Sequence, residues 1–190
     1  MKLNVQNLCK RLRDIMLINT LKVGKMMAEG TYEQVINELD RLGIKYGMVD
    51  HPAAETTEEA DKYIEGHEGV RTKTMFLKGK KHHFYLVIMD DKKPMNFKEF
   101  EELTGAKRVS MARPDDLKEQ LGSHAGVVSP FGLMNNEAHN VQVYFDKDML
   151  AESPVLTFHP NVNTHTIFIK TPDLLNFIKE QGYEPETIDL

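Results

Sequence analysis

The sequence predicts an α+β domain with a mixed, largely antiparallel β-sheet and helices packed outside it. Three observations lead to this prediction. Segments with helical and with strand periodicity both occur, they do not alternate strictly, and a short polar turn joins two successive strand-like segments as in an antiparallel hairpin. With 190 residues, 41% of them hydrophobic, the chain can form one well-cored domain and is too short for two of ordinary size.

Residues 1–26 differ from the rest of the chain in charge. They have a net charge of +5, whereas the whole chain has −5, so the remaining residues carry −10. One interpretation is a short basic amphipathic helix that touches a membrane or RNA. The other, which we adopt, is an N-terminal extension that precedes a natural start at Met26 or Met27. The predicted domain is therefore 27–190.

Composition excludes several classes of protein. No apolar run approaches the roughly 20 residues of a membrane span, and the N-terminus lacks the apolar core of a signal peptide, so a cytoplasmic protein is expected. The single cysteine, Cys9, excludes an intramolecular disulfide and a thiolate metal cluster. The acidic body argues against extensive binding of duplex nucleic acid and leaves contact with one nucleic-acid end open.

Five segments are predicted to be helices because apolar residues recur at helical spacing between residues that start and stop helices. The first runs from the cap Thr31 to Gly43. The second begins with Thr56 and Glu59, which have the spacing of a capping box. The others begin at Asn96, at Pro114 in a favoured first-turn position, and at the cap Thr171, and they end before Gly105, Gly122 and Gly182.

Seven segments are predicted to be strands. The segment 84–89 is almost continuously apolar, so we expect it at the middle of the sheet with both faces buried. The basic turn 78–81 joins it to the strand before it and is expected to be solvated. The predicted strands are 44–49, 70–77, 84–89, 107–111, 141–145, 155–158 and 166–169.

The segment 126–133, Gly-Val-Val-Ser-Pro-Phe-Gly-Leu, has the features of a binding loop. Gly126 and Gly132 bracket Ser129 and Pro130, so the backbone can adopt unusual conformations and approach a ligand closely. Amides that face outward from such a loop would suit an anion or a developing oxyanion. The alternative is a plain turn between two buried segments.

Three familiar chemistries do not match the sequence. His82 and His83 are adjacent and point to opposite faces of a strand, while His159 and His165 are six residues apart across a predicted turn. Neither pair has the usual spacing of metal ligands, so no metal is expected. Pro130 follows Ser129 and lacks the backbone N–H that a serine nucleophile elbow uses. The glycines fit neither dinucleotide-binding nor phosphate-loop motifs, so no cofactor is expected.

Two side chains remain as candidates for a site without metal or thiol. Lys73 lies in an otherwise β-forming segment, where a charged side chain is unusual and indicates a functional role. The alternative is an ordinary strand lysine that faces solvent. His159 follows the predicted strand 155–158, and its alternative is a capping role. Neither residue is decisive alone.

Together these segments resemble the YbaK and prolyl-tRNA editing (ProX) family, which hydrolyses amino acids wrongly attached to tRNA. The resemblance covers 31–183 and rests on five segments in order: the opening helix, His51-Pro52 with the Glu58-Glu59-Ala60 helix, 73–77, 126–133 and 158–164. It implies catalytic roles for Lys73, Gly126 and His159. It also implies that the substrate is bound by Val127, Val128, Ser129, Pro130, Phe131, Gly132 and Asn161.

The chain most resembles the free-standing branch of this family, whose members remove alanine from proline tRNA. This implies a metal-independent deacylase that binds the tRNA acceptor end and supports translation fidelity, with prolyl-tRNA synthetase as a possible partner. Ala54-Glu55-Thr56-Thr57 departs from the family's usual Val-Phe-Thr-Val, which leaves cysteinyl, seryl and threonyl esters open. A non-catalytic domain that binds tRNA or a synthetase is the alternative function.

Overall fold

The computed structural model describes residues 31–190. The predicted N-terminal extension, residues 1–26, lies outside this range.

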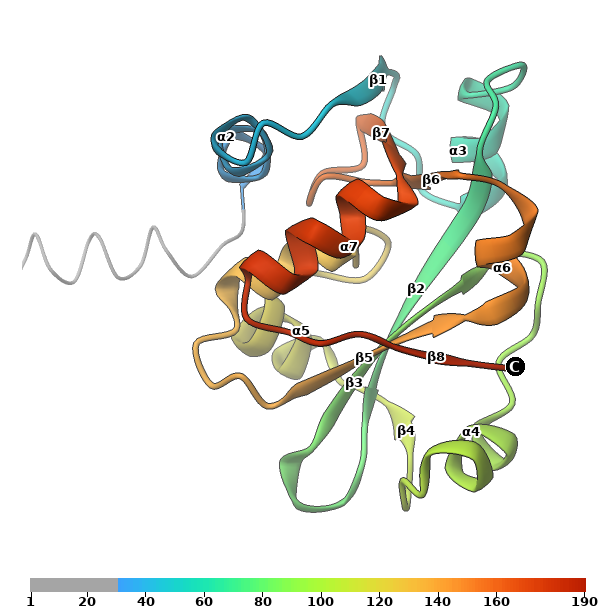
Figure 1. The fold of residues 1–190 in the computed structure, drawn as a ribbon, viewed down its shortest axis with the longest axis vertical. Helices are drawn as coiled ribbons and strands as arrows, with labels where there is room; N and C mark the ends of the chain where they lie inside the picture. The colour runs from blue at the N-terminus through green and yellow to red at the C-terminus, as the bar shows by residue number, and fades with distance from the viewer. Residues whose placement is uncertain (1–30) are drawn as a thin grey trace, which may run out of the picture.

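Eight strands form one mixed sheet in the order β1-β7-β6-β2-β3-β5-β8, with β4 paired to β2 (Figure 1). Four pairings are antiparallel, namely β1 with β7, β6 with β7, and β2 with β3 and β4. Three are parallel, β2 with β6, β3 with β5 and β5 with β8. This confirms the predicted mixed, largely antiparallel sheet. The strands are β1 Tyr46–Asp50, β2 Val70–Lys78, β3 Phe84–Asp90, β4 Ser110–Met111, β5 Val141–Asp146, β6 Val155–Phe158, β7 His165–Lys170 and β8 Glu186–Ile188.

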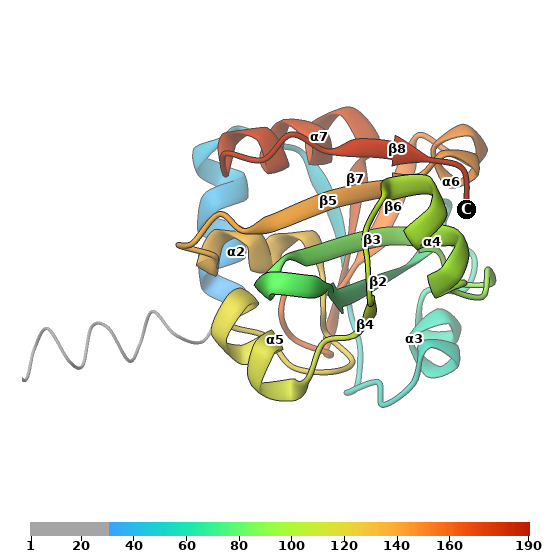
Figure 2. The same ribbon diagram turned by 90° about the horizontal axis from the view of Figure 1, so that it is seen from below.

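The helices lie around this sheet rather than within it (Figure 2). The larger core cluster joins one face of the sheet to apolar side chains of α2, α5 and α7, while a smaller cluster joins the other face to α4 through Phe100. No helix of the described residues is long and apolar enough to cross a bilayer. The helices are α2 Tyr32–Arg41, α3 Thr57–Tyr63, α4 Phe97–Thr104, α5 Pro114–Leu121, α6 Lys147–Glu152 and α7 Thr171–Glu180, with short 3₁₀ turns η1 Lys80–His82 and η2 Pro130–Asn135.

Helix starts follow from the predicted caps. The Thr31 hydroxyl accepts a hydrogen bond from the Gln34 amide at 3.2 Å, and the Thr56 hydroxyl accepts one from the Glu59 amide at 3.2 Å. Each bond satisfies an amide that has no partner inside its helix. Gly105 ends α4 in a left-handed conformation, which costs glycine little.

The strand β2 faces two clusters because its side chains alternate. Phe76 belongs to the larger core cluster and its neighbour Leu77 to the smaller one. Thr72 and Thr74 therefore share a face with Phe76, whereas Lys73 shares a face with Leu77. The central position of β3, next to β2 and β5, matches the prediction for 84–89, since five of its seven residues are buried.

Some predicted elements were wrong in detail. Only Ser110–Met111 of the predicted strand 107–111 pairs with a neighbour, and the cap of α7 is Lys170 rather than Thr171, which is the first residue of the helix. The short helix α6 and the edge strand β8 were not predicted. Such short elements form through packing against the rest of the fold and carry little periodicity of their own.

Candidate functional site

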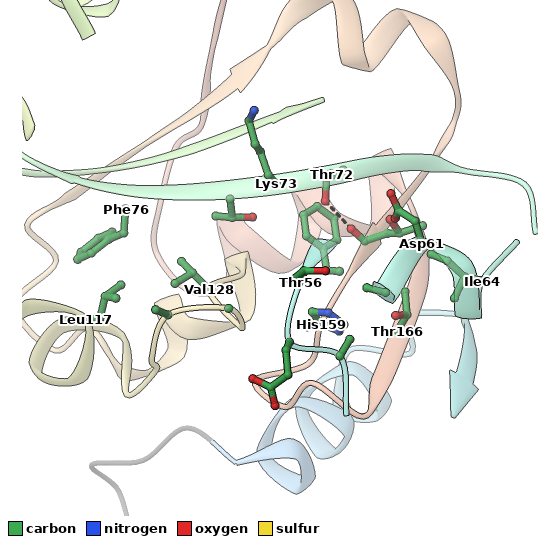
Figure 3. A pocket seen from close by; sticks show the side chains of 18 of the residues that line it. Thr56, Asp61, Ile64, Thr72, Lys73, Phe76, Leu117, Val128, His159 and Thr166 are labelled. Atoms are coloured by element: carbon green, nitrogen blue, oxygen red, sulfur yellow. Dashed lines mark hydrogen bonds between the residues drawn. The ribbon is translucent and has the colours of Figure 1, made fainter. Parts of the chain in front are cut away.

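A pocket with a volume of about 310 Å³ lies between α3, β2, β6 and the loop that contains Gly126 (Figure 3). Its wall combines apolar side chains, five threonines and several ionisable groups. The lining residues are Ala54, Glu55, Thr56, Ala60, Asp61, Ile64, Thr72, Lys73, Thr74, Phe76, Met111, Leu117, Ala125, Gly126, Val128, Thr157, Phe158, His159 and Thr166.

The first half of the predicted binding loop reaches this pocket. Gly126 lines it with a φ of +92°, a conformation that favours glycine, and a Cβ added there would meet nothing within 4 Å. The Val127 amide donates to the His124 carbonyl at 3.3 Å, which closes the turn. Val128 also lines the pocket. The structure therefore brings Gly126 and Val128 to the cavity.

The second half of the loop packs into the core behind the pocket. The ring of Phe131 makes edge contacts with Phe158 and Phe177 at centroid distances of 6.2 and 5.2 Å. Gly132 faces helix α5 so closely that an added Cβ would lie 3.0 Å from Leu121 Cβ. Packing thus explains this glycine. The predicted substrate-binding residues Val127, Ser129, Pro130, Phe131 and Gly132 are all buried and are not among the lining residues.

His159 lies in the pocket wall. Its Nδ1 is 2.8 Å from the His165 carbonyl, which can only accept, so Nδ1 carries the hydrogen and Nε2 of the neutral ring is an acceptor. Burial lowers the pKa of His159 below its usual value, and the nearby His51 acts in the same direction, while the carbonyl of His165 opposes the shift. The imidazole is therefore neutral at pH 7 and can accept a hydrogen bond or a proton.

Asn161 lies in the turn after β6 rather than in the pocket wall. Its φ is +60°, and its amide donates to the His159 carbonyl at 3.0 Å. The side chain is buried, and its Oδ1 has no hydrogen-bond partner among the described residues. The structure therefore links Asn161 to the backbone of His159 and not directly to the cavity.

Lys73 is among the lining residues, but Figure 3 shows its ammonium on the opposite side of β2 from the pocket. The ammonium donates to the Asp91 carbonyl at 3.0 Å and to the Lys93 carbonyl, both in the turn after β3. Burial lowers the pKa of Lys73, and the carboxylates of Asp91 and Asp90 partly offset this effect. The structure does not bring the Lys73 ammonium together with Gly126 and His159.

Carboxylates that sequence reasoning missed lie at the α3 side of the pocket. Asp61 lines the cavity, and its Oδ1 is 3.8 Å from Arg71 Nε. The Arg71 guanidinium also donates to the Ile64 carbonyl at 2.7 Å, so it ties the end of α3 to β2. Burial, together with the carboxylates of Asp61 and Asp90, raises the pKa of Asp91 to about 6. Asp91 therefore lies beside Asp61 at the α3 side of the pocket.

Threonines form a second group that sequence reasoning missed. The Thr72 hydroxyl donates to the Thr157 carbonyl, and the Thr157 hydroxyl donates to the Val70 carbonyl at 3.1 Å, so both side chains hold β2 against β6. The alternation of residues along β2 could have indicated that Thr72 and Lys73 face opposite ways. No sequence signal pairs Thr157 with β2, because parallel pairing joins segments that are remote in the chain.

The described residues contain no group of three histidine, cysteine, aspartate or glutamate side chains that could hold a metal ion. Histidines near the pocket already contact protein oxygens. The two ring nitrogens of His51 lie 2.8 Å from the Pro52 carbonyl and 3.0 Å from Thr166 Oγ1. Chemistry at this site would therefore draw on the Gly126 backbone, a neutral imidazole, threonine hydroxyls and carboxylates.

Known proteins resemble this chain in sequence and in fold. A family model for the aminoacyl-tRNA editing domain matches residues 51–177. The prolyl-tRNA editing protein ProX of Acetoanaerobium sticklandii is 34% identical over 161 residues, which cover 83% of this chain and 96% of the relative. Prolyl-tRNA synthetase associated domain-containing protein 1 of Danio rerio is 30% identical and covers 77% of this chain and 80% of the relative.

The fold is also similar to a solved structure, described as a candidate trans-editing enzyme for prolyl-tRNA synthetase. The TM-score is 0.66 with 23% sequence identity, and the match covers 84% of this chain and 95% of the other. This similarity shows a shared fold.

Proposed function

This chain belongs to the family of aminoacyl-tRNA editing domains, and from that premise we propose that it hydrolyses the ester of a mischarged proline tRNA, with alanine as the amino acid removed. The observation that carries the proposal is that Gly126 and His159, predicted from separate parts of the sequence, line one pocket. The relative ProX is named for prolyl-tRNA editing, which supports proline tRNA as the substrate. Such a substrate belongs to cytoplasmic translation.

The reaction needs alignment more than a strong nucleophile, because an aminoacyl ester is already activated. Water attacks the ester carbonyl carbon, the bond from that carbon to the terminal ribose oxygen breaks, and the ribose oxygen takes up a proton. Amides of the Gly126 loop would stabilise the negative charge that develops on the carbonyl oxygen. The Nε2 lone pair of His159 would orient the water or a ribose hydroxyl.

The composition of the pocket fits a small amino acid with a free α-ammonium group. Its volume of about 310 Å³ is at the lower end of the range for ligand pockets, about 300 to 1,000 Å³. Asp61 and Glu55 in the wall provide negative charge opposite an ammonium, while Ala60, Ile64 and Val128 provide an apolar surface for a short side chain.

Size selection gives this site a purpose. A synthetase pocket that is built for proline also admits a smaller amino acid. Each methylene group that the smaller amino acid lacks changes the binding free energy by only about 1 to 3 kcal/mol, so discrimination is weak. A second site that admits alanine and excludes proline removes the resulting errors. We propose that Val128 and the Gly126 backbone set this size limit, and that Lys73 contributes from the other side of β2 through the turn that carries Asp91.

A panel of esters tests the proposal. Under single-turnover conditions, alanyl-tRNA(Pro) is expected to lose its amino acid at least about tenfold faster than prolyl-tRNA(Pro), which corresponds to about 1.4 kcal/mol. Cysteinyl, seryl and threonyl esters complete the panel. A parallel reaction with EDTA is expected to proceed at the same rate.

Three results would contradict the proposal in different ways. Binding of charged tRNA without hydrolysis of any ester would identify a non-catalytic binding domain. If serine or cysteine is released fastest, the protein is a deacylase, but its preferred ester differs from the one proposed. Loss of hydrolysis in EDTA, with recovery on addition of zinc, would contradict the metal-free mechanism.

A further inference from the structure

The tip of the β2–β3 hairpin and the connection between α4 and β4 meet at one end of the molecule, the lower end in Figure 1. The Lys80 amide donates to the Lys107 carbonyl at 3.1 Å, which joins the two segments. Lys78 and Ser110 also pair across β2 and β4. Two segments that are more than twenty residues apart in the sequence therefore form one surface.

Neither segment contains an acidic residue, although the body of the chain is acidic. Residues 77–89 and 103–114 include no aspartate or glutamate, and together they carry six of the basic residues. Lys78 and Arg113 form ion pairs with Asp116 at 2.5 and 3.4 Å. The other four basic side chains are exposed and have no ion pair within residues 31–190; we call them the basic patch, Lys80, Lys81, Lys107 and Arg108.

Two carboxylates next to this surface are already engaged. Asp116 is occupied by Lys78 and Arg113, and Glu101 accepts the Val109 amide at 2.6 Å. Four like charges that are held close together without counter-charges repel one another, so the arrangement costs folding free energy. A polyanion that binds there would remove this cost.

Backbone conformation points to the same surface. Five described residues other than glycine have positive φ, and three of them, Lys81, His82 and Arg108, lie in or beside the basic patch. This conformation is costly for residues with a side chain, and such strain concentrates at functional sites. All three residues are exposed.

The basic patch also lies close to the pocket. Met111 lines the pocket and is 51% exposed, and Arg108 precedes it by only three residues, so at most about 11 Å of chain separates them. On the other strand, Phe76 lines the pocket and Lys80 follows four residues later. A ligand that extends from the pocket mouth past Met111 would therefore meet the patch.

We propose that the basic patch binds backbone phosphates of the tRNA acceptor arm while the aminoacyl ester occupies the pocket. This inference rests on the proposed function, because it takes the pocket to hold the 3′ end of the tRNA. The patch provides affinity that does not depend on base sequence, and the pocket provides selection of the amino acid. A local patch of this kind explains how an acidic protein binds a polyanion.

The test compares two substrates and two variants. The patch variant is Lys80→Gln, Lys81→Gln, Lys107→Gln and Arg108→Gln. The control variant, Lys45→Gln, Lys98→Gln, Lys170→Gln and Lys179→Gln, removes the same number of charges from exposed lysines outside the patch. The substrates are full-length alanyl-tRNA(Pro) and the alanyl ester of adenosine. Affinity for uncharged tRNA is measured separately by fluorescence anisotropy at several KCl concentrations.

The patch variant is expected to bind tRNA at least about tenfold more weakly at 100 mM KCl, and its salt slope should fall by about one for each phosphate that it no longer neutralises. Hydrolysis of alanyl adenosine should match that of the control variant, and the melting temperature should be no lower than that of the control variant, because the substitutions relieve repulsion within the patch. Equal tRNA affinity in the two variants, or an equal decrease in rate on both substrates, would overturn the patch proposal without affecting the proposed hydrolysis. If the wild-type protein binds tRNA through the patch but hydrolyses no ester, the result supports the proposal for the patch and contradicts the proposed function.

Discussion

The ammonium of Lys73 lies on the opposite side of β2 from the pocket and contacts the turn after β3. Its ammonium donates to the carbonyls of Asp91 and Lys93, so it holds the turn after β3. That turn places Asp91 beside Asp61, which lines the pocket. We therefore propose that Lys73 is a positioning residue in this conformation, since a direct contact with the ester would require its side chain to leave these carbonyls.

Replacing Lys73 by methionine tests this role. The variant Lys73→Met keeps an unbranched stem but leaves two carbonyls without a donor, which is expected to cost about 1 to 3 kcal/mol of folding stability. For a chain of this size each kcal/mol lowers the melting temperature by about 2 to 4 °C. Single-turnover deacylation at a temperature where the variant is folded is expected to fall by about tenfold or more.

Two further variants sharpen the result. Lys73→Arg supplies donors with a planar geometry and should restore stability more than activity. Lys98→Met changes a lysine that is 86% exposed on α4 and should change neither. If Lys73→Met melts and deacylates like the wild type, Lys73 has no part in the site.

At the level of structural elements, the segment 123–135 has two functions. Its first half forms the pocket wall at Gly126 and Val128, and its second half, η2, anchors the segment in the core through Phe131. In the sequence the two glycines look like equivalent brackets of one binding loop. In the structure they have different roles. Gly126 has a left-handed backbone conformation that favours glycine, whereas a side chain at position 132 would come too close to Leu121.

Alanine substitutions distinguish the two glycines. Gly126→Ala strains the backbone by about 1 to 2 kcal/mol without a steric clash and is expected to reduce single-turnover deacylation more than tenfold. Gly132→Ala forces a methyl group against Leu121, which is expected to cost about 1 to 3 kcal/mol of stability and to spare the rate of the folded protein. Equal decreases in rate in the two folded variants would show that the segment acts as one unit.

For the protein as a whole, two groups near the pocket make folding stability depend on pH in opposite directions. Burial raises the pKa of Asp91 to about 6 and lowers the pKa of His159. The stability linked to the Asp91 proton is present below about pH 4 and is lost as pH rises through about 6. The stability linked to neutral His159 is present above about pH 6.5 and is lost as pH falls.

The difference in melting temperature between the Asp91→Asn variant and the wild type is therefore expected to shift in favour of the variant as pH increases from 4 to 8. The amide keeps the shape of the carboxyl group and removes the ionisation. Thermal denaturation at pH 4, 5, 6, 7 and 8 measures the difference in melting temperature. His159→Gln is the control with opposite sign, because its advantage over the wild type should grow as pH falls below about 6.5. A pH-independent difference for Asp91→Asn would mean that the Asp91 carboxyl has an ordinary pKa.

Local sequence was sufficient to predict most helices, the central strands and the family. Caps, breakers and periodicity act within a few residues, so the start of α2 at Thr31 and the hairpin of β2 and β3 could be predicted before the fold was known. Gly126 and His159, which the sequence singled out, line one pocket, and their catalytic roles stay a prediction.

Which side chains meet depends instead on the arrangement of the strands in space. The position of β2 between β6 and β3 determines that Thr72 faces the pocket and that Lys73 reaches the turn after β3. Burial of Ser129 and Asn161 and the meeting of Lys80 with Lys107 likewise depend on contacts between distant segments. Local patterns specify elements because their hydrogen bonds are local, whereas a site depends on how the sheet orders strands that are far apart in the chain.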